Sequence, residues 1–140
     1  MIMKKIEFRA KRTKHSDPSE RWIYGSYVQY KDYQGNERIA IVAHNGNYND
    51  IHKETVGQFT GLTDKCGKEI YEGDIIEDKN GIGVMIWFQT AWGIASYAYG
   101  YDGLKSYTAV DSFYINEAKE WSIIGNIYDN PELLGKEAVK

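Results

Sequence analysis

The sequence predicts a mostly β fold, and three features of its composition lead to that prediction. Fourteen glycines fall between short apolar stretches, and aromatic residues make up 14% of the chain. The two prolines, Pro18 and Pro131, lie outside these stretches. Short apolar runs punctuated by glycine are typical of strands joined by tight turns. We therefore expect many short strands.

The amino-terminal half is expected to contain one strand followed by a hairpin. We predict a strand over Lys4–Ala10, a polar loop over Lys11–Glu20, two hairpin strands over Trp22–Tyr30 and Glu37–Ala43, and a loop over His44–Lys53. The loops are assigned from their Asn, Gly, Asp and Pro residues, which favour turns for reasons of backbone geometry and local hydrogen bonding.

The clearest hairpin signal in the second half is the dipeptide Asn80-Gly81. It separates Asp74–Lys79 from Ile82–Phe88 and suits a type I′ turn, in which both central residues need a positive φ. Further strands are predicted over Trp92–Tyr101 and Trp121–Tyr128.

Two segments of the second half have helical features. Thr108–Lys119 has apolar residues at roughly helical spacing, with Asp111 or Ser112 as a possible cap, and its conformation is ambiguous. Asn130–Leu134 resembles a capping residue followed by proline and one helical turn.

Short, closely spaced strands favour a small barrel or pseudo-barrel, because closure hides the unpaired edges of a sheet. The most economical core is an SH3-like barrel around Glu69–Phe88, with additional strands and one or two short helices. At 140 residues the chain fits a single domain, residues 1–140.

Charge is unevenly distributed along the chain. The net charge is −3, but residues 1–21 contain seven Lys or Arg against three Asp or Glu, a net charge of +4, which leaves −7 for the rest. Such asymmetry is typical of a nucleic-acid-binding arm on an acidic body. It equally fits a basic segment that docks on its own acidic body.

The sequence favours a cytoplasmic protein. The single Cys66 excludes an internal disulfide and fits a reducing compartment. No run approaches the roughly 18 apolar residues that a membrane-spanning helix needs, and the amino terminus lacks the apolar stretch of a signal peptide.

Three blocks of sequence resemble a known family. They are Ile6–Ala10 with Trp22–Gly25, then Glu54–Glu77, and finally Trp121–Leu134. With these blocks the chain resembles the YopX-like proteins of bacteriophages and prophages, whose function is unsettled. The resemblance implies a mostly β fold with barrel character and a phage or prophage origin, and it supplies no catalytic residues. Lys11 and Cys66 depart from the pattern, which tends to have an aromatic residue and Asn at these positions.

The segment Thr63–Lys68 is predicted to be a turn. It is not a phosphate-binding loop, because Gly67-Lys68 is followed by Glu69 and not by Ser or Thr at the start of a helix. We expect Asp64 to accept hydrogen bonds from backbone amides ahead of it and Gly67 to adopt a left-handed conformation. We interpret Cys66 as an exposed residue; the other interpretation is a catalytic Cys–His pair, which would need an enclosed, positively charged niche.

Titratable side chains give no metal or cofactor prediction. The acidic residues between Glu69 and Asp78 fit either a solvated face or a site for a hard cation, and a turn entering a strand at Gly73-Asp74 predicts side chains in water. The three histidines lie in predicted loops without the spacing of zinc ligands.

An aromatic stripe is the best functional candidate. It comprises Trp92, Tyr97, Tyr99, Tyr101 and Tyr107, of which the three tyrosines of one strand alternate with small residues. Tyrosine and tryptophan are enriched at protein interfaces and also stack on nucleobases. The same stripe would serve as a structural ladder of cross-strand aromatic pairs.

We therefore expect a non-catalytic interaction module, with no cofactor, that self-associates or binds a phage or host protein through the stripe. The alternative is a nucleic-acid-binding accessory protein. It would use an aromatic face together with the basic residues Arg9, Lys11, Arg12 and Lys14.

Overall fold

The computed structural model describes residues 4–79, 81–99, 105–113 and 115–134. The chain was expected to form one domain. It groups into two compact units, unit 1 from Met1 to Phe59 and unit 2 from Thr60 to Lys140. Unit 1 has ten Lys or Arg and seven Asp or Glu residues, a net charge of +3; unit 2 has seven and thirteen, a net charge of −6. Strand β5 (Gly57–Thr63) runs through the boundary, so no linker marks it in the sequence.

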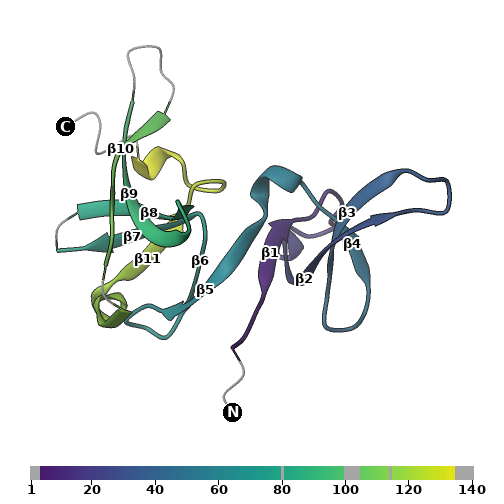
Figure 1. The fold of residues 1–140 in the computed structure, drawn as a ribbon, viewed down its shortest axis with the longest axis horizontal. Helices are drawn as coiled ribbons and strands as arrows, with labels where there is room; N and C mark the ends of the chain where they lie inside the picture. Colours follow the sequence, from purple (N-terminus) through teal and green to yellow (C-terminus); the bar gives the residue numbers. More distant parts are fainter. Residues whose placement is uncertain (1–3, 80, 100–104, 114, 135–140) are drawn as a thin grey trace. The chain divides into compact units, whose positions relative to one another are not determined.

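Unit 1 is an antiparallel sheet in which neighbouring strands follow the order β4-β3-β2-β1-β5 (Figure 1). Its other elements are β1 (Phe8–Lys11), η1 (Pro18–Glu20), β2 (Trp22–Lys31), β3 (Glu37–Val42), β4 (Tyr48–Asp50) and η2 (Lys53–Thr55), where η marks a 3₁₀ helix. The predicted hairpin is confirmed, because β2 pairs with β3 from Lys31 opposite Glu37 to Ser26 opposite Val42. The predicted loop over residues 44–53 contains β4, whose three residues are too few to show strand alternation in a sequence.

Close packing in unit 1 explains why position 25, which belongs to the sequence blocks that carry the family resemblance, is a glycine. Ala10, Ile23, Ile41 and Ile51 form a buried cluster. Gly25 lies on β2 against the backbone of β3, and a Cβ atom there would lie only 2.1 Å from the carbonyl oxygen of Val42. A backbone atom cannot move aside as a flexible side chain can, so this strand contact requires glycine.

Unit 2 contains a five-stranded antiparallel sheet with the order β10-β9-β8-β7-β11 (Figure 1). Its elements are β6 (Glu69–Tyr71), β7 (Asp74–Asp78), β8 (Gly81–Phe88), β9 (Ala91–Tyr99), β10 (Lys105–Asp111), η3 (Ile115–Glu120) and β11 (Ser122–Asn126). The β7–β8 hairpin is confirmed, but its turn is not centred on Asn80-Gly81 as predicted. Gly81, with a φ of +128°, already pairs with Asp78 as the first residue of β8, which leaves residues 79 and 80 as the connection. Asn80 lies outside the described residues.

The ambiguous segment Thr108–Lys119 is divided between two structures. Strand β10 continues to Asp111, and η3 then begins at Ile115. The predicted helical turn after Asn130 is present, because the amides of Leu133 and Leu134 donate to the carbonyls of Asn130 and Pro131. Within the described ranges no helix is long and apolar enough to cross a membrane.

The mostly β prediction is confirmed, whereas a closed barrel is not found. In the described part of unit 2 the five-stranded sheet has two ends, β10 and β11, that are not paired with each other. The SH3-like character of this unit stays a prediction.

The central strands of unit 2 bury side chains on both faces. On one face, Ile76 and Met85 pack with Trp121 and Ala118 in a buried cluster. Side chains alternate along a strand, and accordingly the neighbouring residues Ile75 and Val84 pack on the other face with Leu134. The segments on either side of β11 therefore supply apolar cover for this sheet.

A buried carboxylate joins the turn after β5 to the start of β11. Asp64 Oδ1 accepts hydrogen bonds from the amides of Cys66 and Lys68, both at 2.9 Å, and Oδ2 accepts from the amide of Ile123 at 3.2 Å. Gly67 has a φ of +82°, so both parts of the turn prediction are confirmed. Burial alone would raise the pKa of Asp64, but the amides of Lys68, Ile123 and Cys66 together outweigh it and lower the pKa below its usual value.

A second buried carboxylate corrects the prediction that Gly73-Asp74 places its side chains in water. Asp74 is only 2% exposed, and its Oδ2 accepts the amide hydrogen of Tyr71 at 2.8 Å. Gly73 has a φ of +92°, and its carbonyl accepts from the amide of Ile127 at 3.0 Å. The sequence prediction was wrong because the burial of Asp74 at the start of β7 depends on packing in the folded unit, which a local turn pattern does not show.

An asparagine holds the end of β11 in the same manner. Asn130 Oδ1 accepts from the amide of Asn126 at 3.2 Å, and the Asn130 amide donates to the Asn126 carbonyl at 2.8 Å. A Cβ atom on Gly125 would lie 2.5 Å from Asn130 Oδ1. Gly125-Asn126 and Asn130-Pro131 therefore belong to one turn.

We predict that Asp64→Asn lowers the free energy of unfolding by about 1–3 kcal/mol at pH 7, because the amide group cannot accept a hydrogen bond at both of its ends. Since the folded pKa lies below the unfolded value of about 4, this advantage of Asp64 is present above the unfolded pKa and is lost as the pH falls through the lower folded pKa. Urea unfolding of both proteins from pH 7 into the acid range measures it. If the difference in unfolding free energy between the two proteins does not depend on pH, Asp64 is not an ionised carboxylate in the folded protein.

We predict that Gly25→Ala destabilises unit 1 by about 2 kcal/mol or more, since overpacking against backbone cannot be relieved by a side-chain rotation. Ser26→Ala, on the next and exposed position of β2, is the matched control and should stay within about 0.5 kcal/mol. Thermal unfolding followed by circular dichroism distinguishes the two variants. Equal stability of the two would show that β2 and β3 tolerate a methyl group at this contact.

Candidate functional site

The turn between β8 and β9 has an unusual backbone. Its two residues, Gln89 and Thr90, have φ values of +47° and +74°, and they connect the paired residues Phe88 and Ala91. Two-residue hairpins prefer positive φ at both positions, but asparagine and glycine normally supply it. A positive φ is uncommon for a β-branched residue such as Thr90 and stores backbone strain.

Two tryptophans flank this turn and form what we term the tryptophan hairpin, residues Trp87 to Trp92. Trp87 lies directly opposite Trp92, and their rings meet edge to face at 5.0 Å between centroids. Trp92 packs against the core cluster around Trp121. Trp87, in contrast, is 52% exposed. A large aromatic side chain is thus held at the surface by a second ring that is fixed in the core.

Of the predicted aromatic stripe, the structure describes Trp92 fully and three tyrosines through their backbone. Tyr97 and Tyr99 belong to β9, and Tyr107 of β10 is the register partner of Tyr97. The side chains of these three tyrosines and the whole of Tyr101 lie outside the described residues. Sequence reasoning missed Trp87. Its signal was the symmetric placing of two tryptophans about Gln89-Thr90, a pair that does not look like a tight turn.

The basic residues of the amino-terminal segment do not form one surface. Arg9 is 6% exposed, and its guanidinium lies 4.7 Å from the ring centroid of Trp22. Lys11 brings its ammonium to 5.7 Å from the same centroid. Arg12 is half-buried and Lys14 is exposed. The structure therefore gathers two of the four predicted residues on Trp22, where cation–π attraction holds them.

The remaining titratable candidates are dispersed. Cys66 is exposed in its turn, as predicted. His44 Nε2 lies 2.9 Å from Glu7 Oε1, and His52 Nδ1 lies 3.8 Å from Glu54 Oε1. In the part of the chain that the structure describes, no three His, Cys, Asp or Glu side chains are grouped as a metal ion would require.

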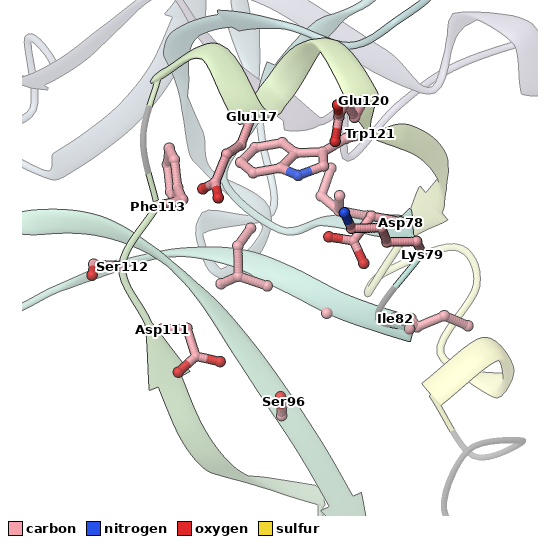
Figure 2. A pocket seen from close by; sticks show the side chains of 14 residues that line it. Asp78, Lys79, Ile82, Ser96, Asp111, Ser112, Phe113, Glu117, Glu120 and Trp121 are labelled. Carbon is pink, nitrogen blue, oxygen red and sulfur yellow. The ribbon is translucent and has the colours of Figure 1, made fainter.

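A pocket of about 280 Å³ opens in unit 2 between η3 and the strands β7, β8 and β9 (Figure 2). Its apolar part includes Ile76, Ile94 and Trp121, and Phe113 meets Trp121 edge to face at 4.9 Å between ring centroids. Four carboxylates and one ammonium group also line it; they belong to Asp78, Asp111, Glu117, Glu120 and Lys79. The pocket thus joins an aromatic surface to a strongly acidic one.

Comparison with known proteins identifies a family. A family model described as YopX protein matches residues 7–135. No curated protein matches the chain. Among solved structures, the crystal structure of protein EF1440 from Enterococcus faecalis is similar, with 26% sequence identity, 92% of this chain and 97% of that chain covered, and a TM-score of 0.40. Because the family model spans almost the whole sequence, the chain belongs to the YopX family.

Proposed function

We propose that this protein is a non-catalytic interaction module that binds a protein partner, in the first place a second copy of itself, through the tryptophan hairpin. The observation that carries this proposal is the half-exposed ring of Trp87, supported from below by Trp92. Tryptophan is the residue type most enriched among the side chains that dominate binding energy at protein interfaces.

The geometry favours binding by a fixed surface. Covering the exposed part of Trp87 removes apolar area from water, which is favourable by roughly 25 cal/mol per Å². Because Trp92 already restricts the Trp87 ring, little side-chain freedom is left to lose on association. A hairpin of this kind suits a two-fold contact, in which the same patch serves on both copies.

The resemblance to phage and prophage proteins suggests a second class of partner. If the protein comes from a phage or prophage and acts in the cytoplasm of the bacterial host, its partner is a phage protein or a host protein. We also propose that the strands of unit 2 are organised as in SH3-like domains.

Nucleic-acid binding through the basic segment is the alternative, and it has less support. Arg9 is buried against Trp22, so Lys11, Arg12 and Lys14 would have to supply the phosphate contacts. Such contacts release counterions and make affinity fall steeply with salt. Salt-sensitive binding of an oligonucleotide that disappears in Lys11→Glu/Lys14→Glu would favour this alternative.

We predict that Trp87→Ala weakens self-association at least about tenfold, equivalent to about 1.4 kcal/mol, because the interface loses its largest apolar side chain. Sedimentation velocity over a range of protein concentrations measures the dissociation constant. The matched control is Tyr33→Ala, which removes an almost fully exposed aromatic ring in the β2–β3 turn and should leave association unchanged. A wild-type protein that stays monomeric throughout, or an equal effect of both substitutions, would refute self-association through this hairpin.

A further inference from the structure

The acidic pocket of unit 2 is separate from the residues of the tryptophan hairpin and has its own chemistry. Four carboxylates and a single ammonium line it, so its local charge is negative. Carboxylates gathered around a concave, partly apolar surface focus a negative potential and favour a cation. Helix η3 contributes Glu117 and Glu120 to the lining, and their carboxylates lie on different sides of the Trp121 ring (Figure 2).

A hydrogen-bond donor on the pocket wall adds a requirement beyond positive charge. Trp121 is 4% exposed, and Figure 2 shows its indole nitrogen on the edge of the ring that faces the pocket. Among the described residues, Trp121 makes backbone hydrogen bonds and a ring contact with Phe113, and its indole N–H donates to none of them. The N–H is therefore available on the pocket wall. The pocket therefore offers a hydrogen bond that an occupant would complete.

The size and walls of the pocket limit the occupant. A volume of about 280 Å³ is at the lower end for ligand sites, and it suits a single amino-acid side chain or a small amine better than a nucleotide. Ile76, Ile94 and the Phe113–Trp121 pair supply apolar and aromatic contact. An ammonium group near these rings also gains cation–π attraction.

We propose that this pocket binds a primary ammonium group that carries a neutral oxygen acceptor and an apolar side chain on the adjoining carbon. The ammonium lies among the carboxylates, the oxygen accepts the Trp121 N–H, and the side chain contacts the isoleucines and Phe113. The amino-terminal residue of a peptide and a free amino-acid amide share this chemistry. Each of the three groups on the ligand has its own complement among the described residues of the pocket.

The test uses the full-length protein and three small probes, followed through the indole ¹H–¹⁵N signal of Trp121. L-leucinamide, at pH 6.5 where its amine is protonated, should shift this signal saturably. N-acetyl-leucinamide, which lacks the positive charge, should bind at least about tenfold more weakly. Isoamylamine, which keeps the ammonium and the side chain but lacks the carbonyl oxygen, should bind about three- to tenfold more weakly. The peptide Leu-Gly-Gly-amide distinguishes the two sources: binding comparable to leucinamide identifies a peptide terminus, and rejection identifies a small free amine.

Variants of the protein distinguish binding in the pocket from general attraction of a cation to an acidic surface. Asp111→Asn with Glu120→Gln, at two exposed positions, should weaken leucinamide binding about tenfold, and Lys79→Ala should strengthen it about two- to threefold. Glu77→Gln removes the same charge one residue from Asp78 but outside the pocket lining, so it should change affinity less than about twofold. The Trp87→Ala variant should bind leucinamide as the wild type does.

Three results would overturn the proposal: a Trp121 signal that does not respond to leucinamide, equal affinity for the acetylated probe, or a loss in Glu77→Gln as large as in the double variant. Circular dichroism of each variant confirms that the fold is retained. Because Lys79→Ala is expected to increase affinity, a binding change in that direction cannot arise from unfolding.

Discussion

The fold of unit 2 depends on the carboxylate of Asp64, which accepts three backbone amides and so fixes two distant segments to each other. Two of the amides belong to its own turn, and the third belongs to Ile123, 59 residues later in the chain. The carbonyl of Trp121, two residues before Ile123, accepts the amide of Lys65 at 3.0 Å, which reinforces the same contact. Because Trp121 also closes the core and forms a wall of the acidic pocket, the position of that pocket follows from the carboxylate.

The residues that carry the family resemblance share this kind of role. Asp74 accepts the amide of Tyr71, Asn130 caps the turn at Asn126, and Gly25 lets β2 approach β3. Buried polar groups must be paired, and a side chain that satisfies orphan amides of the backbone stabilises an irregular connection between short strands. The family pattern is thus explained by the backbone geometry of its turns. Trp87, the side chain proposed to bind a protein partner, lies outside the three blocks that carry the resemblance.

Local signals in the sequence were sufficient for the elements that short-range chemistry determines. The β7–β8 hairpin followed from the Asn80-Gly81 signal, although its turn lies one residue earlier than predicted. The turn around Asp64 followed from the Asx and glycine pattern. Burial of Asp74 and Arg9 did not follow, because it depends on contacts made only in the folded chain. The tryptophan hairpin was missed since Gln89 and Thr90 adopt positive φ against their own preference. The acidic pocket combines residues of β7, β8, β9, β10 and η3, and no single stretch of sequence contains it.

The central claim is that Asp64 acts as an ionised acceptor buried among backbone amides. Carbon-detected NMR of its side-chain carboxyl group in the folded protein, followed from neutral to acidic pH, tests this most directly. A titration midpoint clearly below the usual aspartate value of about 4 is the predicted result. A midpoint at or above that value would mean that burial outweighs the amides, and the carboxylate would then not be the group that holds β11 to the turn.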